Sequence, residues 1–177
     1  YRFVHGIPSI NKAWLDRLGL EMPGDADELL EVLRAFRDQD ANGNGDPNDE
    51  IPTMFQMSNP ASWAGQRSPG FIAAFYFGIP MGPRNIIEDG ELVYKWQHPR
   101  AQDFVHFLAT LYQEGLMPED ALSLDSAAVN ARAAEGNVGL LHQWTVQHTL
   151  TSAESYEQYV WLLPDHDEEA YYTRFFV

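Results

Sequence analysis

The chain has 177 residues, a formal net charge of −15 at pH 7 and no cysteine. This length allows one domain with a substantial core, or two very small ones. The negative charge argues against nucleic acid or an anionic membrane surface as a partner. The lack of cysteine excludes disulfides and thiolate metal sites. Hydrophobic residues make up 45% of the sequence, which argues against disorder.

Both ends of the sequence are expected to lie inside a longer protein. The first residue is not Met, and an apolar stretch of extended character stands at each end. The lack of a signal peptide therefore carries no information about cellular location. No apolar run approaches the roughly 20 residues that a transmembrane helix needs.

The first part of the chain predicts an extended segment followed by two helices. Residues 1–10 are expected to be extended, with Pro8 ending any strand ladder. A short helix is predicted at 11–18. A stronger helix is predicted at about 27–38, where apolar residues recur at helical spacing after a capping aspartate.

The rest of the chain alternates between short strands and helices. Asp89-Gly90 separates two β-prone runs, 85–88 and 91–96, and this pattern predicts a hairpin. The other predicted strands are 51–57, 138–141 and 159–163, the helices are 71–77, 99–114 and 126–135, 58–70 is a loop, and 146–156 is helical or irregular. Together these elements indicate an α/β fold, with a mixed sheet flanked by helices.

The most distinctive stretch is the acidic segment 38–52. Oxygen-bearing side chains stand at Asp40, Asn42, Asn44, Asp46, Asn48, Asp49 and Glu50. Alternate spacing in a tight loop turns such side chains towards one centre, and Gly43 and Gly45 can take the positive φ that the loop needs. Crowded carboxylates repel one another, and a divalent cation removes that repulsion. An all-oxygen donor set suits calcium better than zinc or magnesium, so we expect a structural calcium ion.

This segment matches only the opening of an EF-hand loop. Positions one to six fit when they are counted from Asp40. The twelfth position, where EF-hands carry a bidentate glutamate, is Ile51, and Pro52 opposes an exiting helix. We therefore expect a helix, a loop and then an extended segment. The alternative is a solvated acidic turn, because Asn, Gly and Asp are ordinary loop residues.

One continuous pattern links the first two predicted helices to the acidic segment. It runs through Asn11–Leu20, Met22-Pro23, Asp27–Leu29, Leu33–Phe36 and Asp40–Pro52. The pattern resembles the extracellular solute-binding proteins (family 1) of bacterial ABC importers, in their sugar- and oligosaccharide-binding group of lipoproteins. Leu111–Leu116 and Glu135–Leu141, with Trp144 following, are similar to later landmarks of that family. The resemblance touches most of the chain and is most specific in residues 11–52.

The resemblance implies the two-lobed periplasmic-binding-protein fold (class II). Residues 1–177 would form the second lobe as a single α/β unit, with hinge crossings near 1–10 and 159–164. In calcium-bearing members of the family the metal ligands come from a loop of this kind. Carried over, they are Asp40, Asn42, Asn44, the carbonyl of Asp46, Asp49 and Glu50. One extra residue after Gly45 leaves open whether Asn48 replaces one of these ligands.

A site for sugars needs an aromatic plate with polar groups around its edge. Trp144 follows a predicted buried strand, at a strand end where clefts form in α/β folds. Trp63 lies in a polar loop. The candidate solute contacts are Trp144, Gln143, His142, Trp63, Arg67 and Tyr76. The alternative for both tryptophans is a place in the core.

Three functions are open as hypotheses. The first is the solute-binding component of an ABC importer, without catalysis. It holds a carbohydrate or similar polar solute between two lobes and is recognised in its closed form by permease subunits. The implied location is the cell surface, as a membrane-anchored lipoprotein, or the periplasm. The alternatives are a calcium-stabilised fragment of a carbohydrate-active enzyme, with two carboxyls about 5 to 10 Å apart, and a calcium-dependent protein-interaction module.

Overall fold

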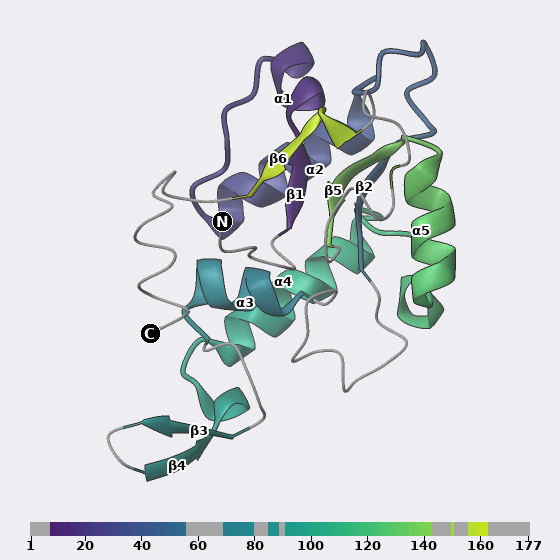
Figure 1. Ribbon diagram of the computed structural model, residues 1–177. Coiled ribbons are helices and arrows are strands. Elements are labelled where there is room, and N and C mark those ends of the chain that lie inside the picture. Colours follow the sequence, from purple (N-terminus) through teal and green to yellow (C-terminus); the bar gives the residue numbers. More distant parts are fainter. Residues whose placement is uncertain are drawn as a thin grey trace.

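A four-stranded mixed sheet forms the centre of the computed structural model (Figure 1), which describes residues 8–55, 69–79, 85–88, 91–142, 150 and 156–162. The strand order is β2 (Ile51–Met54), β5 (Val138–Leu141), β1 (Ser9–Asn11) and β6 (Tyr159–Trp161). β2 and β5 run parallel, whereas β1 is antiparallel to both β5 and β6. The predicted α/β fold with a mixed sheet is confirmed.

Local capping signals set the ends of the first two helices. α1 (Lys12–Leu18) begins where the Asn11 side chain accepts a hydrogen bond from an amide of the first turn, and it ends at Gly19 with φ of +67°. α2 (Ala26–Asp38) begins where the Asp25 carboxylate accepts hydrogen bonds from two amides of its first turn. Both predicted helices are confirmed.

The remaining elements follow the predicted order. The other helices are α3 (Gly70–Phe77), α4 (Ala101–Gln113) and α5 (Ser126–Ala134), with short 3-10 helices at Lys95–Gln97 and Ala121–Ser123. β3 (Asn85–Glu88) and β4 (Glu91–Tyr94) pair antiparallel, which confirms the predicted hairpin, and Figure 1 shows it apart from the main sheet. Among the described residues, no helix is long and apolar enough to cross a membrane.

The prediction that Pro8 ends the first strand is wrong, because β1 begins directly after it. Pro8 has no amide hydrogen to donate, but its carbonyl accepts a hydrogen bond from the Leu162 amide at 2.8 Å. This bond extends the pairing of β1 with β6. The predicted strand at 51–57 is shorter than expected and ends at Met54. Most of the predicted segments 58–70 and 146–156 fall outside the described residues.

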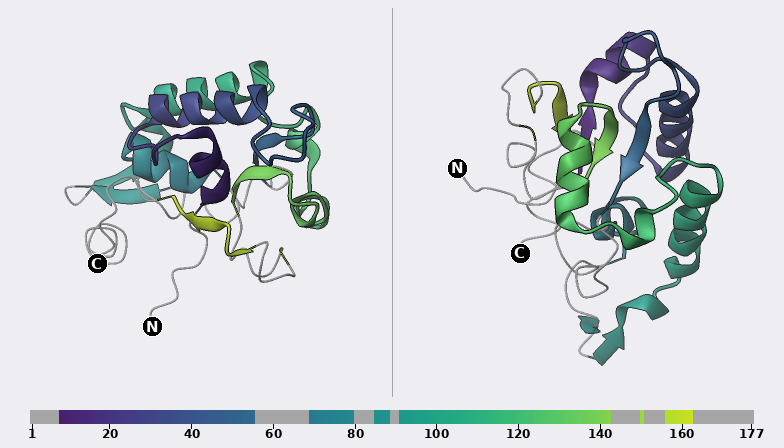
Figure 2. Two further views of the ribbon diagram at one scale, coloured as in Figure 1. Left: turned by 90° about the horizontal axis from the view of Figure 1, so that it is seen from above. Right: turned by 90° about the vertical axis from the view of Figure 1, so that its right-hand side faces the viewer.

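Helices α2 and α4 lie on the same side of the sheet, as the two views of Figure 2 show. The main core forms between these helices and the strands, and Leu29, Leu33 and Phe36 of α2 are fully buried in it. The Phe36 ring meets the Trp14 ring edge-on, with ring centroids 5.2 Å apart and planes at 86°. Burial of one such ring contributes about 2 kcal/mol to stability.

Gly139 in β5 lets α2 approach the sheet closely. A Cβ built on Gly139 would lie 2.3 Å from Cδ2 of Phe36 and 3.0 Å from the Pro52 carbonyl oxygen. Real side chains do not tolerate such distances, so this strand position needs glycine. Phe36 can then pack directly over the β2–β5 pair, and the chain leaving α2 is delivered to the start of β2.

We expect Gly139→Ala to lower the free energy of unfolding by about 2 kcal/mol, because the added methyl overlaps the Phe36 ring. Chemical denaturation measures the change. The double variant Gly139→Ala with Phe36→Leu removes the overlapping ring edge, so it should lose less stability than the two single variants summed. Strict additivity of the two single effects would contradict the proposed overlap.

Candidate functional site

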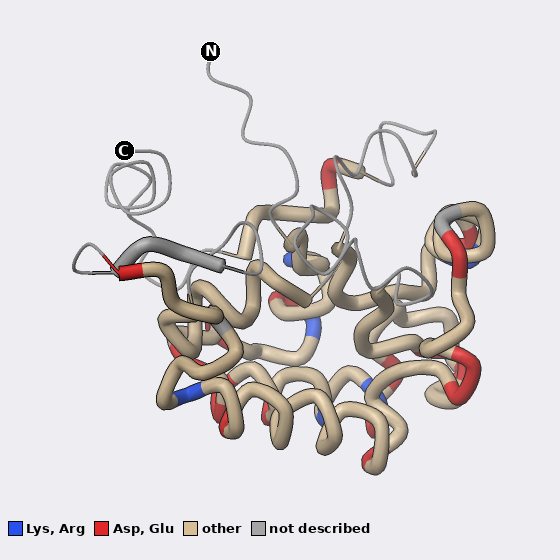
Figure 3. Tube along the Cα trace, turned by 90° about the horizontal axis from the view of Figure 1, so that it is seen from below, with Lys and Arg blue, Asp and Glu red and all other residues tan. Residues whose placement is uncertain are grey.

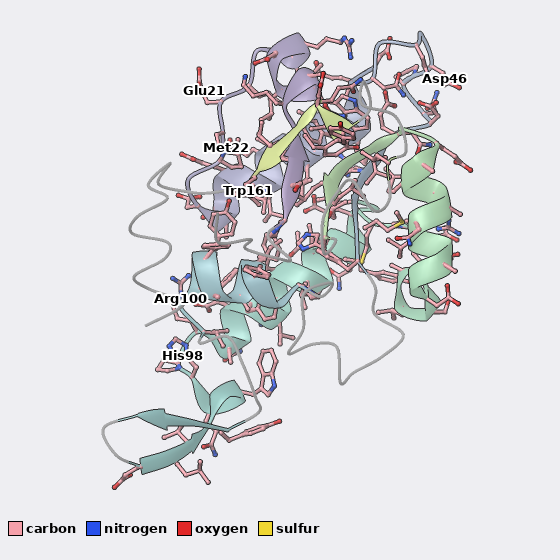
Figure 4. The ribbon with its side chains drawn as sticks, viewed as in Figure 1. Glu21, Met22, Asp46, His98, Arg100 and Trp161 are labelled. Carbon is pink, nitrogen blue, oxygen red and sulfur yellow. The ribbon has the colours of Figure 1, made fainter. Side chains whose placement is uncertain are left out.

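The acidic loop connects α2 to β2 and lies beyond the amino-terminal end of β2, where Asp46 marks it in Figure 4. The predicted order of helix, loop and extended segment is confirmed. Gly43 and Gly45 have φ of +76° and +94°, in the left-handed region that favours glycine. The two glycines therefore let the loop turn twice within a few residues.

Aspartate and asparagine side chains close this loop on itself. Both carboxylate oxygens of Asp40 accept hydrogen bonds from glycine amides of the loop, at 2.8 and 3.0 Å. Both oxygens of Asp49 accept hydrogen bonds from side-chain amides, from Asn42 at 2.8 Å and from Asn44 at 2.7 Å. The structure therefore brings three of the six predicted metal ligands, Asn42, Asn44 and Asp49, into direct contact with one another, while Asp40 binds the loop backbone.

The two other predicted ligands, Asp46 and Glu50, differ in their surroundings. Oδ1 of Asp46 accepts hydrogen bonds from the backbone and side-chain amides of Asn48, at 3.1 and 3.0 Å. Oε1 of Glu50 accepts a hydrogen bond from the Asn42 backbone amide at 3.3 Å, whereas Oε2 is buried and has no hydrogen-bond partner among the described residues. A buried carboxylate oxygen without a partner is costly, and a cation would satisfy it.

The donor set of the loop fits calcium in kind. Asp and Glu are spread along the trace in Figure 3. The ion pairs between described residues include none of the carboxylates from Asp40 to Glu50. In the described part of the chain, no three His, Cys, Asp or Glu side chains converge in a metal-binding arrangement. The predicted ligands are mixed, because two are asparagines and one is a carbonyl. Calcium accepts such mixed oxygen donors.

Two residues outside the loop hold it in place, and neither was predicted from the sequence. Nη1 of Arg17 in α1 donates a hydrogen bond to the Ala41 carbonyl at 2.5 Å, and its guanidinium packs on Gly43. Nδ2 of Asn137, directly before β5, donates a hydrogen bond to the Asp49 carbonyl at 2.9 Å. These partners are 24 and 88 residues apart in sequence, and no local pattern reveals such contacts.

The carboxyl ends of β2 and β5 meet at the opposite end of the strands from the acidic loop. Phe55 and His142 follow these strands, and their ring centroids lie 4.2 Å apart with planes at 60°. Both side chains are buried, and neither ring nitrogen of His142 has a hydrogen-bond partner in the part of the chain that the structure describes. Burial lowers the pKa of His142 to about 3, so the imidazole is neutral near pH 7.

Four of the predicted solute contacts, Trp144, Gln143, Trp63 and Arg67, fall outside the described residues. Their roles stay predictions. Along the chain, Gln143 and Trp144 directly follow His142, and the segment with Trp63 follows Phe55. The two segments therefore leave neighbouring strand ends, where ligand sites of α/β folds occur. Phe55 was not predicted as part of this region, although its place near the carboxyl end of the predicted strand 51–57 was a usable signal.

Of the two predicted contacts that are described, His142 is buried, and its contact with a solute stays a prediction. The other, Tyr76, lies in α3. It is 8% exposed, and its hydroxyl donates a hydrogen bond to the Pro23 carbonyl at 3.1 Å. Burial raises the pKa of Tyr76, with a smaller effect from the nearby carboxylates of Asp25 and Glu28. The residue borders a surface pocket of about 480 Å³ between α2, α3 and α4. Its hydroxyl is therefore used within this unit, and its contact with a solute stays a prediction.

Sequence comparison identifies relatives that share most of this chain. No protein-family model matches it. It is 33% identical over 156 residues to FusA, a fructooligosaccharide ABC transporter substrate-binding protein of Streptococcus pneumoniae serotype 4. It is 30% identical over 135 residues to the lipoprotein LipO of Bacillus subtilis strain 168. The matches cover 87% and 75% of this chain but 28% and 25% of the relatives, so it spans less than a third of their length.

Solved structures agree with the sequence matches. FusA in complex with kestose superposes with a TM-score of 0.76 at 32% identity, over 90% of this chain and 31% of that one. An EF-hand mutant of FusA in complex with fructo-nystose gives 0.76 at 31% identity over the same shares. An extracellular solute-binding protein from Bifidobacterium longum subsp. infantis gives 0.77 at 28%, over 90% of this chain and 34% of that one. The chain belongs to the family of ABC transporter substrate-binding proteins, and it matches part of the length of its relatives.

We expect His142 to make the fold less stable as the pH falls. The unfolded imidazole gains its proton near pH 6.5, whereas the buried imidazole stays neutral until about pH 3. The contribution of the neutral His142 imidazole to the free energy of unfolding is therefore complete above pH 6.5. It is lost progressively below that pH, by about 2 kcal/mol at pH 5. Urea denaturation at pH 8 and pH 5 measures this loss.

The variant His142→Phe keeps a ring at this position and removes the titration, so its stability should fall less between pH 8 and pH 5. The exposed His106 on α4 provides the matched control, and His106→Gln should keep the full pH dependence of the original chain. An unchanged pH dependence in His142→Phe would contradict the burial of a neutral imidazole.

Proposed function

We propose that the chain is one lobe of the solute-binding component of an ABC importer, and that it supplies half of an interlobe cleft for a carbohydrate, an oligosaccharide or a similar polar solute. The observation that carries this proposal is the similarity to FusA over 87% of the chain. FusA is a fructooligosaccharide-binding relative, and its complexes hold kestose and fructo-nystose. Fructooligosaccharides are therefore the first solutes to test.

The pairing of β1 with β6 supports a hinge at one side of the lobe. The two strands are antiparallel neighbours, and they are bracketed by the hydrogen bond from Leu162 to Pro8 and by one from the Lys12 amide to the Gln158 carbonyl at 2.7 Å. The first and last strands of the described residues are therefore neighbours in the sheet. Such an arrangement suits two crossings to a second lobe, near 1–10 and 159–164, and closure of the lobes by a hinge motion.

The proposed half-cleft lies at the carboxyl ends of β2 and β5. Trp144 and Trp63 would supply the aromatic plates on which sugar rings stack, and Gln143 and Arg67 the polar groups at the ring edges. His142, also a predicted contact, is buried against Phe55 and would support the half-cleft through this ring contact. Tyr76 is kept as a peripheral candidate.

We also propose a structural calcium ion in the acidic loop. The residues that would hold it are Asp40, Asn42, Asn44, the carbonyl of Asp46, Asp49 and Glu50. The ion would neutralise the crowded carboxylates. The buried Oε2 of Glu50, which has no partner, supports this role, as does the existence of an EF-hand in FusA, of which a mutant structure is known.

The whole protein would act by binding and delivery, without catalysis. The closed form would be handed to permease subunits in the membrane, and the location would be the cell surface or the periplasm. The relative LipO is a lipoprotein, which favours a membrane-anchored form. No observation on the described residues favours the two alternatives, an enzyme fragment or a calcium-dependent interaction module.

Removal of calcium is expected to lower the melting temperature of the protein. An ion that binds only the folded state at a hundred times its Kd adds about 2.7 kcal/mol, which for a chain of this length shifts the melting temperature by about 5 °C or more. Differential scanning calorimetry in calcium and in EGTA measures the shift. Glu50→Gln should abolish the calcium-dependent shift. Asp103→Asn, which changes an exposed carboxylate on α4, should leave it intact. Equal melting temperatures after verified metal removal would exclude the structural ion.

Oligosaccharide binding is the direct test of the proposed function. Isothermal titration calorimetry of the protein that carries this lobe, with kestose and nystose and with maltotriose for comparison, should detect binding of an oligosaccharide. Trp144→Ala should weaken it at least tenfold through loss of stacking. The exposed Tyr112 on α4 offers a matched aromatic control, and Tyr112→Ala should bind normally. No binding across a broad oligosaccharide set, or normal binding by Trp144→Ala, would contradict the proposed site.

A further inference from the structure

Asn137 is held against the acidic loop at two points. It lies in the turn between α5 and β5, directly after Gly136 with φ of +82°. Its Nδ2 donates a hydrogen bond to the Asp49 carbonyl at 2.9 Å, and its own carbonyl accepts one from the Ile51 amide at 2.8 Å. These two contacts hold the backbone on both sides of Glu50, and they come from the turn that precedes β5.

Glu50 is the loop carboxylate whose environment is least satisfied. Its Oε1 has a long hydrogen bond to the Asn42 amide, and its Oε2 is buried without a partner. Oδ1 of Asn137 is also buried, and no described residue forms a hydrogen bond with it. By contrast, both carboxylate oxygens of Asp40 and of Asp49 accept hydrogen bonds within the loop. The carboxylate oxygen that most needs a cation, Oε2 of Glu50, therefore belongs to the residue between the two that Asn137 contacts.

We propose that Asn137 is a positioning residue for the calcium loop. By fixing the Asp49 carbonyl and the Ile51 amide, it holds the Glu50 carboxylate in its inward orientation before any ion arrives. This inference rests on the proposed calcium site and adds the residue that sets its affinity. An ordered ligand binds more tightly because less conformational entropy is lost on binding.

The position of Asn137 also explains how the loop depends on the sheet. β2 follows the loop directly in sequence, and β5 lies beside β2 in parallel. The Asn137 side chain therefore adds a second hydrogen bond between the turn before β5 and the end of the loop, beside the backbone bond to Ile51. The two hydrogen bonds of Asn137 therefore join the loop to the β2–β5 pair. Phe55 and His142 follow these strands at their other end.

The test compares calcium affinity with the stability of the metal-free protein. Asn137→Ala should raise the calcium Kd about tenfold or more, as measured by isothermal titration calorimetry, and should reduce the rise in melting temperature that calcium causes. Asn137→Ser, which keeps a small polar side chain too short to reach the Asp49 carbonyl, should raise the Kd in the same direction and replaces the alanine variant if that one does not fold.

Asn11→Ala is the matched control for a purely structural effect. Asn11 is a buried asparagine that, like the partly buried Asn137, has a buried side-chain atom without a partner among the described residues, and it caps α1. Its loss should lower the melting temperature in EGTA while the calcium Kd stays within about twofold of the original value.

The outcomes distinguish failure of the positioning role from failure of the proposed calcium site. If the original chain binds calcium and Asn137→Ala binds it with the same Kd, the positioning role is overturned and the calcium site stands. The same conclusion follows if Asn11→Ala and Asn137→Ala raise the Kd equally. If the original chain does not bind calcium at all, the calcium site and the positioning role are both overturned.

Discussion

The parallel pairing of β2 with β5 is the constraint on which the rest of the structure depends. Thr53 is fully buried within it, and its hydroxyl donates a hydrogen bond to the Leu140 carbonyl at 3.3 Å. The Phe36 ring packs directly against this strand pair because Gly139 has no side chain. A parallel pair cannot be closed by a tight turn, so its two strands come from distant parts of the chain and need helices between them.

This pairing gives the strands two different ends. At the amino-terminal end, the acidic loop is held by α2, by Arg17 of α1 and by Asn137 before β5. At the carboxyl end, Phe55 and His142 lie in contact, and the segments with the candidate sugar-stacking tryptophans begin. The proposed calcium ion would therefore act at a distance from the solute, by keeping the strand pair in register rather than by touching the ligand.

The acidic loop also shows how this structure balances negative charge. Outside the loop, carboxylates pair with arginines, as Glu114 does with Arg34 and Asp120 with Arg132, and these partners lower the carboxyl pKa values. Within the loop the carboxylates accept hydrogen bonds from neutral amides instead. Neutral donors orient the oxygens without cancelling their charge, and that is a suitable state for receiving a divalent cation.

The sequence by itself determined the local features of this protein. The caps at Asn11, Gly19 and Asp25, the Asp89-Gly90 hairpin and the glycines of the acidic loop all depend on neighbouring residues, and each was predictable from the sequence. The contacts between residues that are distant in the sequence were decided only by the tertiary structure. Examples are the side chains of Arg17 and Asn137 on the loop, the extension of β1 pairing through the Pro8 carbonyl, and the packing of Phe36 on Gly139. These contacts join residues far apart in the chain, and their energy comes from packing and burial, on which local patterns carry no information.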